Sequence, residues 1–284
     1  MYAGTNVASK GAFRFEEKKF EKIAIDNALK EVTKEQIVVK GWDDDYFKFS
    51  DWRKRLKVFL DDFNPNVIFH VGACSDTMEQ DANFMMVRNY ESTKIISNWA
   101  KSKNVPLIYS SSAAIYGTNN EYPSNLYGWS KYVAEDFVHN NGGVSLRYFN
   151  VYGPGEEHKG AMASVAHQMF MKNKNGEEVK LFPNKPTRDF VYIDDVVDAN
   201  IFAFKNYDKL KSDYIKYYEV GSGVARTFED VMEILDIEYS YHDESVIPVG
   251  YQFGTKSDFW MEGWGPKFTL ESGLTEYKKY LENS

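Results

Sequence analysis

Tyr127 and Lys131 are the residues of this chain whose types and spacing most clearly allow chemistry. They stand four residues apart in the run Tyr-Pro-Ser-Asn-Leu-Tyr-Gly-Trp-Ser-Lys, residues 122–131. On a helix this spacing places both side chains on one face, one turn apart. An ammonium group beside a phenol favours the phenolate and should lower the phenol pKa from its usual value of about 10. The pair therefore predicts a tyrosine that acts as a general acid/base.

The sequence upstream distinguishes Tyr127 from the other tyrosines. The same spacing occurs at two other places, where a solvated helix face explains it equally well: Tyr90/Lys94 and Tyr207/Lys211. Val-Pro-Leu-Ile-Tyr-Ser-Ser-Ser (105–112), in contrast, has the pattern of a buried strand that ends in hydroxyls. Ser112 at the strand end and Tyr127 and Lys131 on the next helix can then converge on one substrate hydroxyl.

Two segments before this helix have features that suit a dinucleotide. Asp26-Asn27 ends a short apolar stretch, and an acid at a strand end can accept hydrogen bonds from ribose hydroxyls. A turn or a helix cap explains the pair as well. Such an acid disfavours a 2′-phosphate, but a cation such as Lys48 could offset it, so NAD and NADP both remain open. The stretch His70 to Ser75 leads into small residues, which allow close approach of a cofactor, and a packing role is expected for His70.

Two later segments suit a phosphorylated sugar. The loop 150–160 carries Asn150, His158 and Lys159, which could recognise a sugar and a diphosphate, and Lys159 could be a second acid/base. A solvated turn is the alternative. Farther along the chain, Arg188 could donate two hydrogen bonds to a phosphate while Phe182 stacks on a base. A core phenylalanine and a surface ion pair to the neighbouring Asp189 are the alternative there.

Composition excludes several classes of protein. The net charge of −8 is unfavourable for a protein that binds a nucleic-acid backbone. No apolar run approaches the roughly 20 residues of a membrane span, and the N-terminal residues lack the apolar core of a signal peptide. The single cysteine, Cys74, fits a reducing compartment. We therefore expect a cytoplasmic protein without nucleic-acid or membrane partners, and the spacing of the five histidines and Cys74 predicts no metal site.

Short apolar strands alternate with helices through the first half of the chain, which is typical of parallel βαβ units. The expected strands are 22–26, 66–72, 105–111 and 143–149, and the expected helices are 50–63, 81–103 and 127–139. We predict an α/β fold with a Rossmann-like, doubly wound parallel sheet and a smaller, interleaved α/β lobe. Residues 1–149 and 189–222 would form the dinucleotide-binding domain, and 150–188 and 223–284 the substrate lobe, with 189–222 returning to the main sheet.

Several longer motifs resemble those of a known family. They are His70-Val-Gly-Ala-Cys-Ser-Asp-Thr-Met-Glu-Gln-Asp, Ser111-Ser-Ala-Ala-Ile-Tyr-Gly, Arg147-Tyr-Phe-Asn-Val-Tyr-Gly-Pro, His158-Lys-Gly-Ala-Met-Ala-Ser-Val-Ala and Arg188-Asp-Phe-Val-Tyr. With these motifs, residues 22–280 resemble the extended short-chain dehydrogenase/reductases, the NAD-dependent epimerase/dehydratase family. More narrowly, they resemble the members that epimerise ADP-glyceromanno-heptose at C6.

The resemblance implies an isomerase that uses NADP or NAD and acts by transient oxidation and re-reduction at C6 of a nucleotide sugar, with ADP-heptose as the expected substrate. It also implies a homo-oligomer. The implied catalytic residues are Tyr127, Lys131, Lys159 and Ser112. The implied cofactor-binding residues are Asp26, Asn27, Val71, Gly72, Ala73, Cys74, Ser75, Lys131 and Val151. The implied substrate-binding residues are Ser112, Asn150, Ala161, Gln168, Phe182, Arg188 and Tyr251.

The first residues depart from the family pattern. The family opens with a strand and a glycine-rich turn that receives the cofactor pyrophosphate at a helix N-terminus, whereas this chain offers only Gly4 and Gly11 there. We expect a truncated or diverged turn that binds the cofactor with a micromolar or weaker Kd. One alternative is therefore a catalytically impaired homologue that still binds sugar nucleotides. The other is an epimerase of a different nucleotide sugar, and Ala113-Ala114 argues against a dehydratase.

Overall fold

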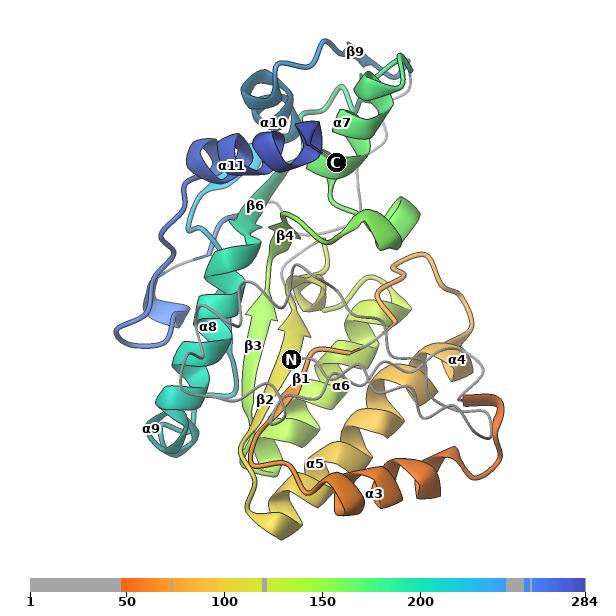
Figure 1. The fold of residues 1–284 in the computed structure, drawn as a ribbon, viewed down its shortest axis with the longest axis vertical. Coiled ribbons are helices and arrows are strands. Elements are labelled where there is room, and N and C mark those ends of the chain that lie inside the picture. The colour runs from red at the N-terminus through yellow and green to blue at the C-terminus, as the bar shows by residue number, and fades with distance from the viewer. Residues whose placement is uncertain (1–46, 73, 119–121, 244–252, 256, 284) are drawn as a thin grey trace.

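The computed structural model describes residues 47–283, except for 73, 119–121, 244–252 and 256. Its centre is a parallel sheet with the strand order β1-β2-β3-β7 (Figure 1). The four strands are β1 (Ile68–His70), β2 (Leu107–Ser112), β3 (Val144–Tyr148) and β7 (Tyr218–Val220). Since all four run in the same direction, their carboxyl ends lie at one edge of the sheet, where ligands of such folds bind.

Helices cover both faces of this sheet (Figure 1). One face carries α3 (Trp52–Phe63), α5 (Ser92–Lys103) and α6 (Leu126–Asn140), and the other carries α8 (Ile193–Lys205) and α9 (Tyr207–Ser212). Alternate residues of β2 pack against the helices on opposite faces of the sheet. Leu107 and Tyr109 belong to the core beneath α3, α5 and α6, whereas Ile108 between them belongs to the core beneath α8. This alternation is the two-residue period of a strand, and burial on both faces explains its nearly continuous apolar sequence.

A smaller lobe lies beyond the carboxyl edge of the sheet, at the top of Figure 1. Its strands form a three-stranded sheet, β4-β6-β8, and a two-stranded sheet, β5-β9. The strands are β4 (Asn150–Tyr152), β6 (Thr187–Tyr192), β8 (Ala225–Thr227), β5 (Lys180–Leu181) and β9 (Ser240–Tyr241). Helices α7 (Val165–Lys174), α10 (Phe228–Leu235) and α11 (Leu270–Glu282) pack around one apolar core with β6.

The pairing of β6 differs from the sequence expectation. We expected all of 189–222 to return to the main sheet, but β6 pairs in parallel with β4 and antiparallel with β8. Only β7 from this segment pairs with the main sheet, through β3. The patterns could not separate the two sheets, because β6 is buried on both sides in either arrangement. The division of the chain into two interleaved domains stays a prediction.

Most of the other expected elements are present. The strand expected at 22–26 lies outside the described residues. The long helix expected at 81–103 is present as three consecutive helical pieces: α4 (Ala82–Met86), a π-helical turn (Val87–Glu91) and α5. In the part of the chain that the structure describes, no helix is both long and apolar enough to cross a bilayer.

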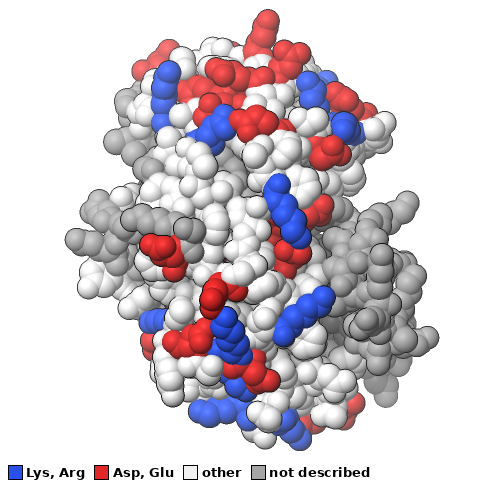
Figure 2. Space-filling view, turned by 90° about the vertical axis from the view of Figure 1, so that its left-hand side faces the viewer, with Lys and Arg blue, Asp and Glu red and all other residues white. Residues whose placement is uncertain are grey.

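Charged side chains of both signs share the face of the molecule shown in Figure 2. Acidic side chains gather at the top of that view, over the smaller lobe, with Lys and Arg residues among them. Among the described residues on this face, the Lys and Arg side chains form no continuous stripe, in keeping with the net charge of −8 of the whole chain.

A buried ion pair joins the central strands to α6. Arg147 of β3 donates from Nε and Nη2 to the two carboxylate oxygens of Glu135, at 2.8 and 2.7 Å. Ser111 of β2 donates to Glu135 Oε2 at 2.6 Å. Burial opposes the charge on Arg147, but the hydrogen bonds and charge of Glu135 outweigh it and raise the pKa of Arg147. The guanidinium also stacks on the ring of Tyr217, 3.3 Å from its centroid.

We predict that Arg147→Met lowers the free energy of unfolding by about 3–5 kcal/mol, because it leaves the Glu135 carboxylate buried without a countercharge. Denaturant unfolding measures the change. Glu262→Gln is the control, since it breaks an ion pair to Lys209 that is largely exposed, and such pairs contribute about 0–1 kcal/mol. Equal losses in the two variants would contradict a special role for the buried pair.

Candidate active site

The structure places Ser112 at the end of β2 and Tyr127 in the first turn of α6. Helix α6 begins where it does because the Asn125 side chain caps it, accepting a hydrogen bond from the Gly128 backbone N–H at 2.8 Å. Gly128 also lets the helix approach the turn after β2, since a Cβ atom at this position would stand 2.6 Å from the carbonyl oxygen of Ala114. The Ser112 hydroxyl shapes the same turn by accepting from the Ala114 N–H at 3.1 Å.

Lys131 lies one turn after Tyr127 on α6, and its side chain is buried. Its Nζ donates to the Ser110 carbonyl at 2.7 Å. It lies 4.9 Å from the ring centroid of Tyr109 and 5.9 Å from that of Tyr127. Burial lowers the pKa of Lys131 to about 7. The structure therefore brings together Ser112, Tyr127 and Lys131 at the carboxyl edge of the sheet, as the spacing predicted.

The expected direction of the Tyr127 pKa is wrong for this structure. Burial raises the pKa of Tyr127 above its usual value, and hydrogen bonding to Ser112 offsets only part of that rise. Sequence spacing identified the neighbouring ammonium but could not show that the site desolvates both groups. Burial disfavours both the Tyr127 phenolate and the Lys131 ammonium. Deprotonation of Tyr127 therefore needs a bound substrate or cofactor that stabilises the phenolate.

Asn89 is a residue of this region that the sequence reasoning missed. Its side chain accepts from the Cys74 N–H at 2.8 Å and donates to the Cys74 carbonyl at 3.0 Å and to Ser130 Oγ at 2.9 Å. It thus ties the loop after β1 to α6. A signal was present in the sequence: Asn89 continues the buried four-residue spacing of Met85 and Thr93, and a buried amide in such a row needs partners.

His70 has the packing role that we expected. Its Nε2 lies 2.8 Å from Thr93 Oγ1 in the buried layer between β1 and α5. Burial and the nearby charge of Lys131 lower the pKa of His70 to about 3, so the ring is neutral near neutral pH.

The residues after β1 can accommodate a dinucleotide. Val71 and Gly72 are exposed at the carboxyl end of β1, and a Cβ added to Gly72 would meet no atom within 4 Å. Cys74 is half-buried and Ser75 is exposed. This open edge beside the buried Lys131 fits a nicotinamide cofactor. Val151 lies in β4 against the core under α8, while Asp26, Asn27 and Ala73 lie outside the described residues.

The loop after β4 carries Lys159, which is exposed in a short 3₁₀ segment (Glu157–Met162). Among the contacts of the described residues, none joins Lys159 to Tyr127 or Ser112, so its role as a second acid/base stays a prediction. Gln168 on α7 donates to the carbonyl oxygens of Ala161 and Ala163, at 3.1 and 2.7 Å. Its side chain therefore shapes the loop.

The remaining substrate candidates lie on or near β4 and β6. Asn150 is half-buried in β4 and opposite Phe190 of β6. Phe182 is half-buried, with its ring centroid 5.7 Å from that of His242. Arg188 is buried in β6 and donates to the Thr187 carbonyl at 2.8 Å. Tyr251 lies outside the described residues.

The alternative of a surface ion pair between Arg188 and Asp189 is wrong, because Asp189 is fully buried. Its carboxylate accepts hydrogen bonds from Ser222, Gly223 and Thr255 at 2.6–3.0 Å. Asp189 thus fastens two loops of the lobe to β6 instead of neutralising its neighbour.

Comparison with known proteins identifies the class. Residues 8–221 match the model of the NAD dependent epimerase/dehydratase family. Over 92% of its length the chain is 36% identical to an ADP-L-glycero-D-manno-heptose-6-epimerase from Brachyspira hyodysenteriae, covering 90% of that protein. The protein therefore belongs to this family and is an NAD(P)-dependent enzyme, as the sequence resemblance predicted.

Solved structures agree with this assignment. The Helicobacter pylori ADP-L-glycero-D-manno-heptose-6-epimerase has a TM-score of 0.72 and 30% sequence identity, with 84% of this chain and 78% of that one covered. The Thermotoga maritima UDP-glucose 4-epimerase has a TM-score of 0.69 and 25% identity, with 81% and 82% covered. The predicted fold class is thereby confirmed.

The lowered pKa of Lys131 yields a prediction about stability. Between its folded value of about 7 and its unfolded value of about 10.4, the unfolded chain binds more protons than the folded one. The contribution of Lys131 to the free energy of unfolding should therefore rise as the pH rises through this window. The stability difference between wild type and Lys131→Met, measured by denaturant unfolding at several pH values from 7 to 10, should change in that direction. A difference that stays flat would contradict the buried, desolvated position of Lys131.

Proposed function

We propose that the protein is an epimerase of ADP-glyceromanno-heptose that inverts C6 by transient oxidation and re-reduction. The observation that carries the chemistry is the meeting of Ser112, Tyr127 and Lys131 at the carboxyl edge of the sheet. The similarity to heptose epimerases, which extends over most of the chain, supports the substrate.

In this mechanism Tyr127 accepts the proton of the C6 hydroxyl and later returns it, while Ser112 hydrogen-bonds the same oxygen. Lys131 is fixed by the Ser110 carbonyl and positioned to favour the phenolate when the site is closed and dry. A bound nicotinamide supplies the acceptor and donor of the C6 hydride. The ketone formed in between must present its other face before it is reduced.

Lys159 is the proposed second acid/base, which serves the face of the ketone that Tyr127 does not reach. Lys159 lies on the loop after β4, whereas Tyr127 lies on α6. The Lys159 side chain is exposed, so its ammonium can approach a substrate from the side of the lobe. Asn150, Ala161, Gln168, Phe182 and Arg188 are proposed to line the sugar-nucleotide side, together with Tyr251.

Two alternatives keep the fold but change the function. The similarity to a UDP-glucose 4-epimerase favours an epimerase of another nucleotide sugar. A homologue that binds sugar nucleotides without turnover is the other, and it predicts ADP-heptose binding with no change at C6. Product analysis with ADP-heptose and UDP-glucose, with NAD or NADP added, separates all three.

We further propose a cytoplasmic homo-oligomer. Stacked aromatic rings of Tyr122 and Trp129, with centroids 6.2 Å apart, are exposed at the start of α6 and could be covered by a second copy. Light scattering of the purified protein tests the assembly, and a monomer at micromolar concentration would contradict it.

Tyr127→Phe should lower kcat by about 10²–10⁴-fold, since it removes the acid/base hydroxyl, and leave binding of ADP-heptose nearly unchanged. Steady-state kinetics and calorimetry measure the two effects. Tyr90→Phe is the matched control. Tyr90 has the same spacing to a lysine, but its ring packs on Phe137 of α6 and its lysine, Lys94, pairs with Glu91. Similar losses in both variants would mean that Tyr127 is not the acid/base.

Arg188→Ala should mainly raise KM for the sugar nucleotide, by about 10–100-fold, as expected for the loss of a hydrogen bond to a charged group. Titration calorimetry with ADP measures the same loss without turnover. Arg226→Ala is the control, since Arg226 stands opposite Arg188 in β8 but pairs with Asp230 and Glu271. An unchanged affinity in Arg188→Ala would remove Arg188 from the site.

A further inference from the structure

The loop that carries Lys159 is organised around one buried carboxylate, that of Glu156. Glu156 is 3% exposed, although the next five residues are all exposed. Its Oε2 accepts from the Ser164 N–H at 2.5 Å, and its Oε1 accepts from the Ser164 hydroxyl at 2.7 Å. The Gly153 N–H makes a longer contact to Oε1 at 3.4 Å. The side chain of Glu156 therefore joins the first and last residues of the loop 153–164.

The same carboxylate anchors the loop to two helices. The Tyr277 hydroxyl of α11 donates to Glu156 Oε1 at 2.9 Å, and the His167 Nδ1 of α7 lies 3.0 Å from that hydroxyl. Ser164, which donates to Glu156, also caps α7 by accepting from the His167 N–H. Burial and the charge and hydrogen bond of Glu156 raise the pKa of Tyr277, so the phenol keeps the proton that it donates.

Lys159 itself depends on this anchor for its place. Its backbone N–H donates to the Glu156 carbonyl at 2.9 Å, and the next residue, Gly160, leaves the helical conformation with φ 53° and ψ −123°. Fixing the backbone of such a loop in one conformation costs conformational entropy. A fully satisfied buried carboxylate at the base of the loop opposes that cost.

We propose that Glu156 is a positioning residue for Lys159, holding the loop so that the ammonium reaches the substrate carbon opposite Tyr127. This rests on the proposed function of Lys159. A carboxylate suits this place because it accepts hydrogen bonds at both oxygens. In Glu156→Gln the amide N–H₂ either faces the Ser164 N–H, which cannot accept, or takes the place of Oε1, where the hydroxyls of Ser164 and Tyr277 must turn to accept and the Gly153 N–H faces a donor.

Glu156→Gln should lower kcat by about 10²-fold through misplacement of the acid/base, with KM changed by less than about threefold. The loss should be strongly reduced in a Lys159→Ala background, because a residue that acts through Lys159 has nothing left to position. A loss of the same size in both backgrounds, or no loss in Glu156→Gln, would overturn the proposal.

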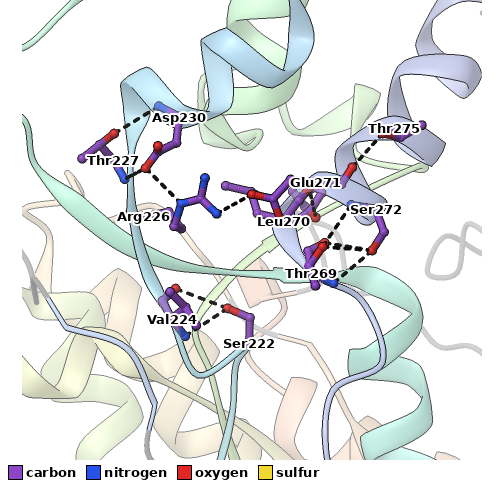
Figure 3. Close-up of polar contacts among 11 residues, drawn as sticks. Ser222, Val224, Arg226, Thr227, Asp230, Thr269, Leu270, Glu271, Ser272 and Thr275 are labelled. Atoms are coloured by element: carbon purple, nitrogen blue, oxygen red, sulfur yellow. Dashed lines mark hydrogen bonds and ion pairs between the residues drawn. The ribbon is translucent and has the colours of Figure 1, made fainter.

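Glu271→Gln is the control for general effects on the lobe. Glu271 lies on the same helix as Tyr277 and pairs with Arg226 at 2.6 Å, as Figure 3 shows, but it is exposed and far along the chain from the loop. It should leave kcat within about twofold. Tyr277→Phe, which removes one donor and keeps the Ser164 contacts, should have a smaller effect than Glu156→Gln.

Hydrogen exchange separates failure of this inference from failure of the proposed function. If the wild type does not epimerise ADP-heptose, the function fails, and the anchoring is then decided by amide exchange of a peptide covering 157–163 in the full-length protein. Faster exchange in Glu156→Gln than in Glu271→Gln, with similar melting temperatures, supports the anchor. Equal exchange in the two variants would overturn it.

Discussion

The buried ion pair between Glu135 and Arg147 is the interaction on which the site depends. Glu135 stands four residues after Lys131 and eight after Tyr127, on the same face of α6. The same carboxylate accepts from Ser111, the neighbour of Ser112 on β2. The Glu135 carboxylate therefore fixes the position and rotation of α6 relative to β2. Because Arg147 comes from the next strand, β3, the pair also fixes the order of the sheet beneath the site.

Two titratable groups near the site are buried. Lys131 and His70 are 3% and 8% exposed, and burial lowers the pKa of each. Electrostatic effects are larger in such surroundings than in water, so a substrate oxygen, Tyr127 and Lys131 can influence one another strongly. The same burial raises the pKa of the Tyr127 phenol in the free protein. Interactions with the bound substrate must therefore favour its deprotonation.

The sequence predicted the parts of the structure that local patterns determine. The strand 105–112, the helix that carries Tyr127 and the meeting of Ser112 with Lys131 follow from a two-residue period, a four-residue spacing and a short loop. The pairing of β6 with β4 and β8 could not be predicted in this way. A strand that is buried on both faces has the same apolar pattern in either sheet. Asn89 and Glu156 were missed since their roles depend on partners that are distant in the chain, such as Cys74 and Tyr277.

In the proposed reaction C6 loses and regains the same hydride in a site built by Tyr127 and its neighbours. The most direct measurement uses ADP-glyceromanno-heptose deuterated at C6, incubated with the full-length protein and NADP or NAD, and mass spectrometry of the inverted product. Inversion with the deuterium retained at C6 is expected. Inversion with loss of the label to water, or no inversion at all with bound substrate, would contradict it.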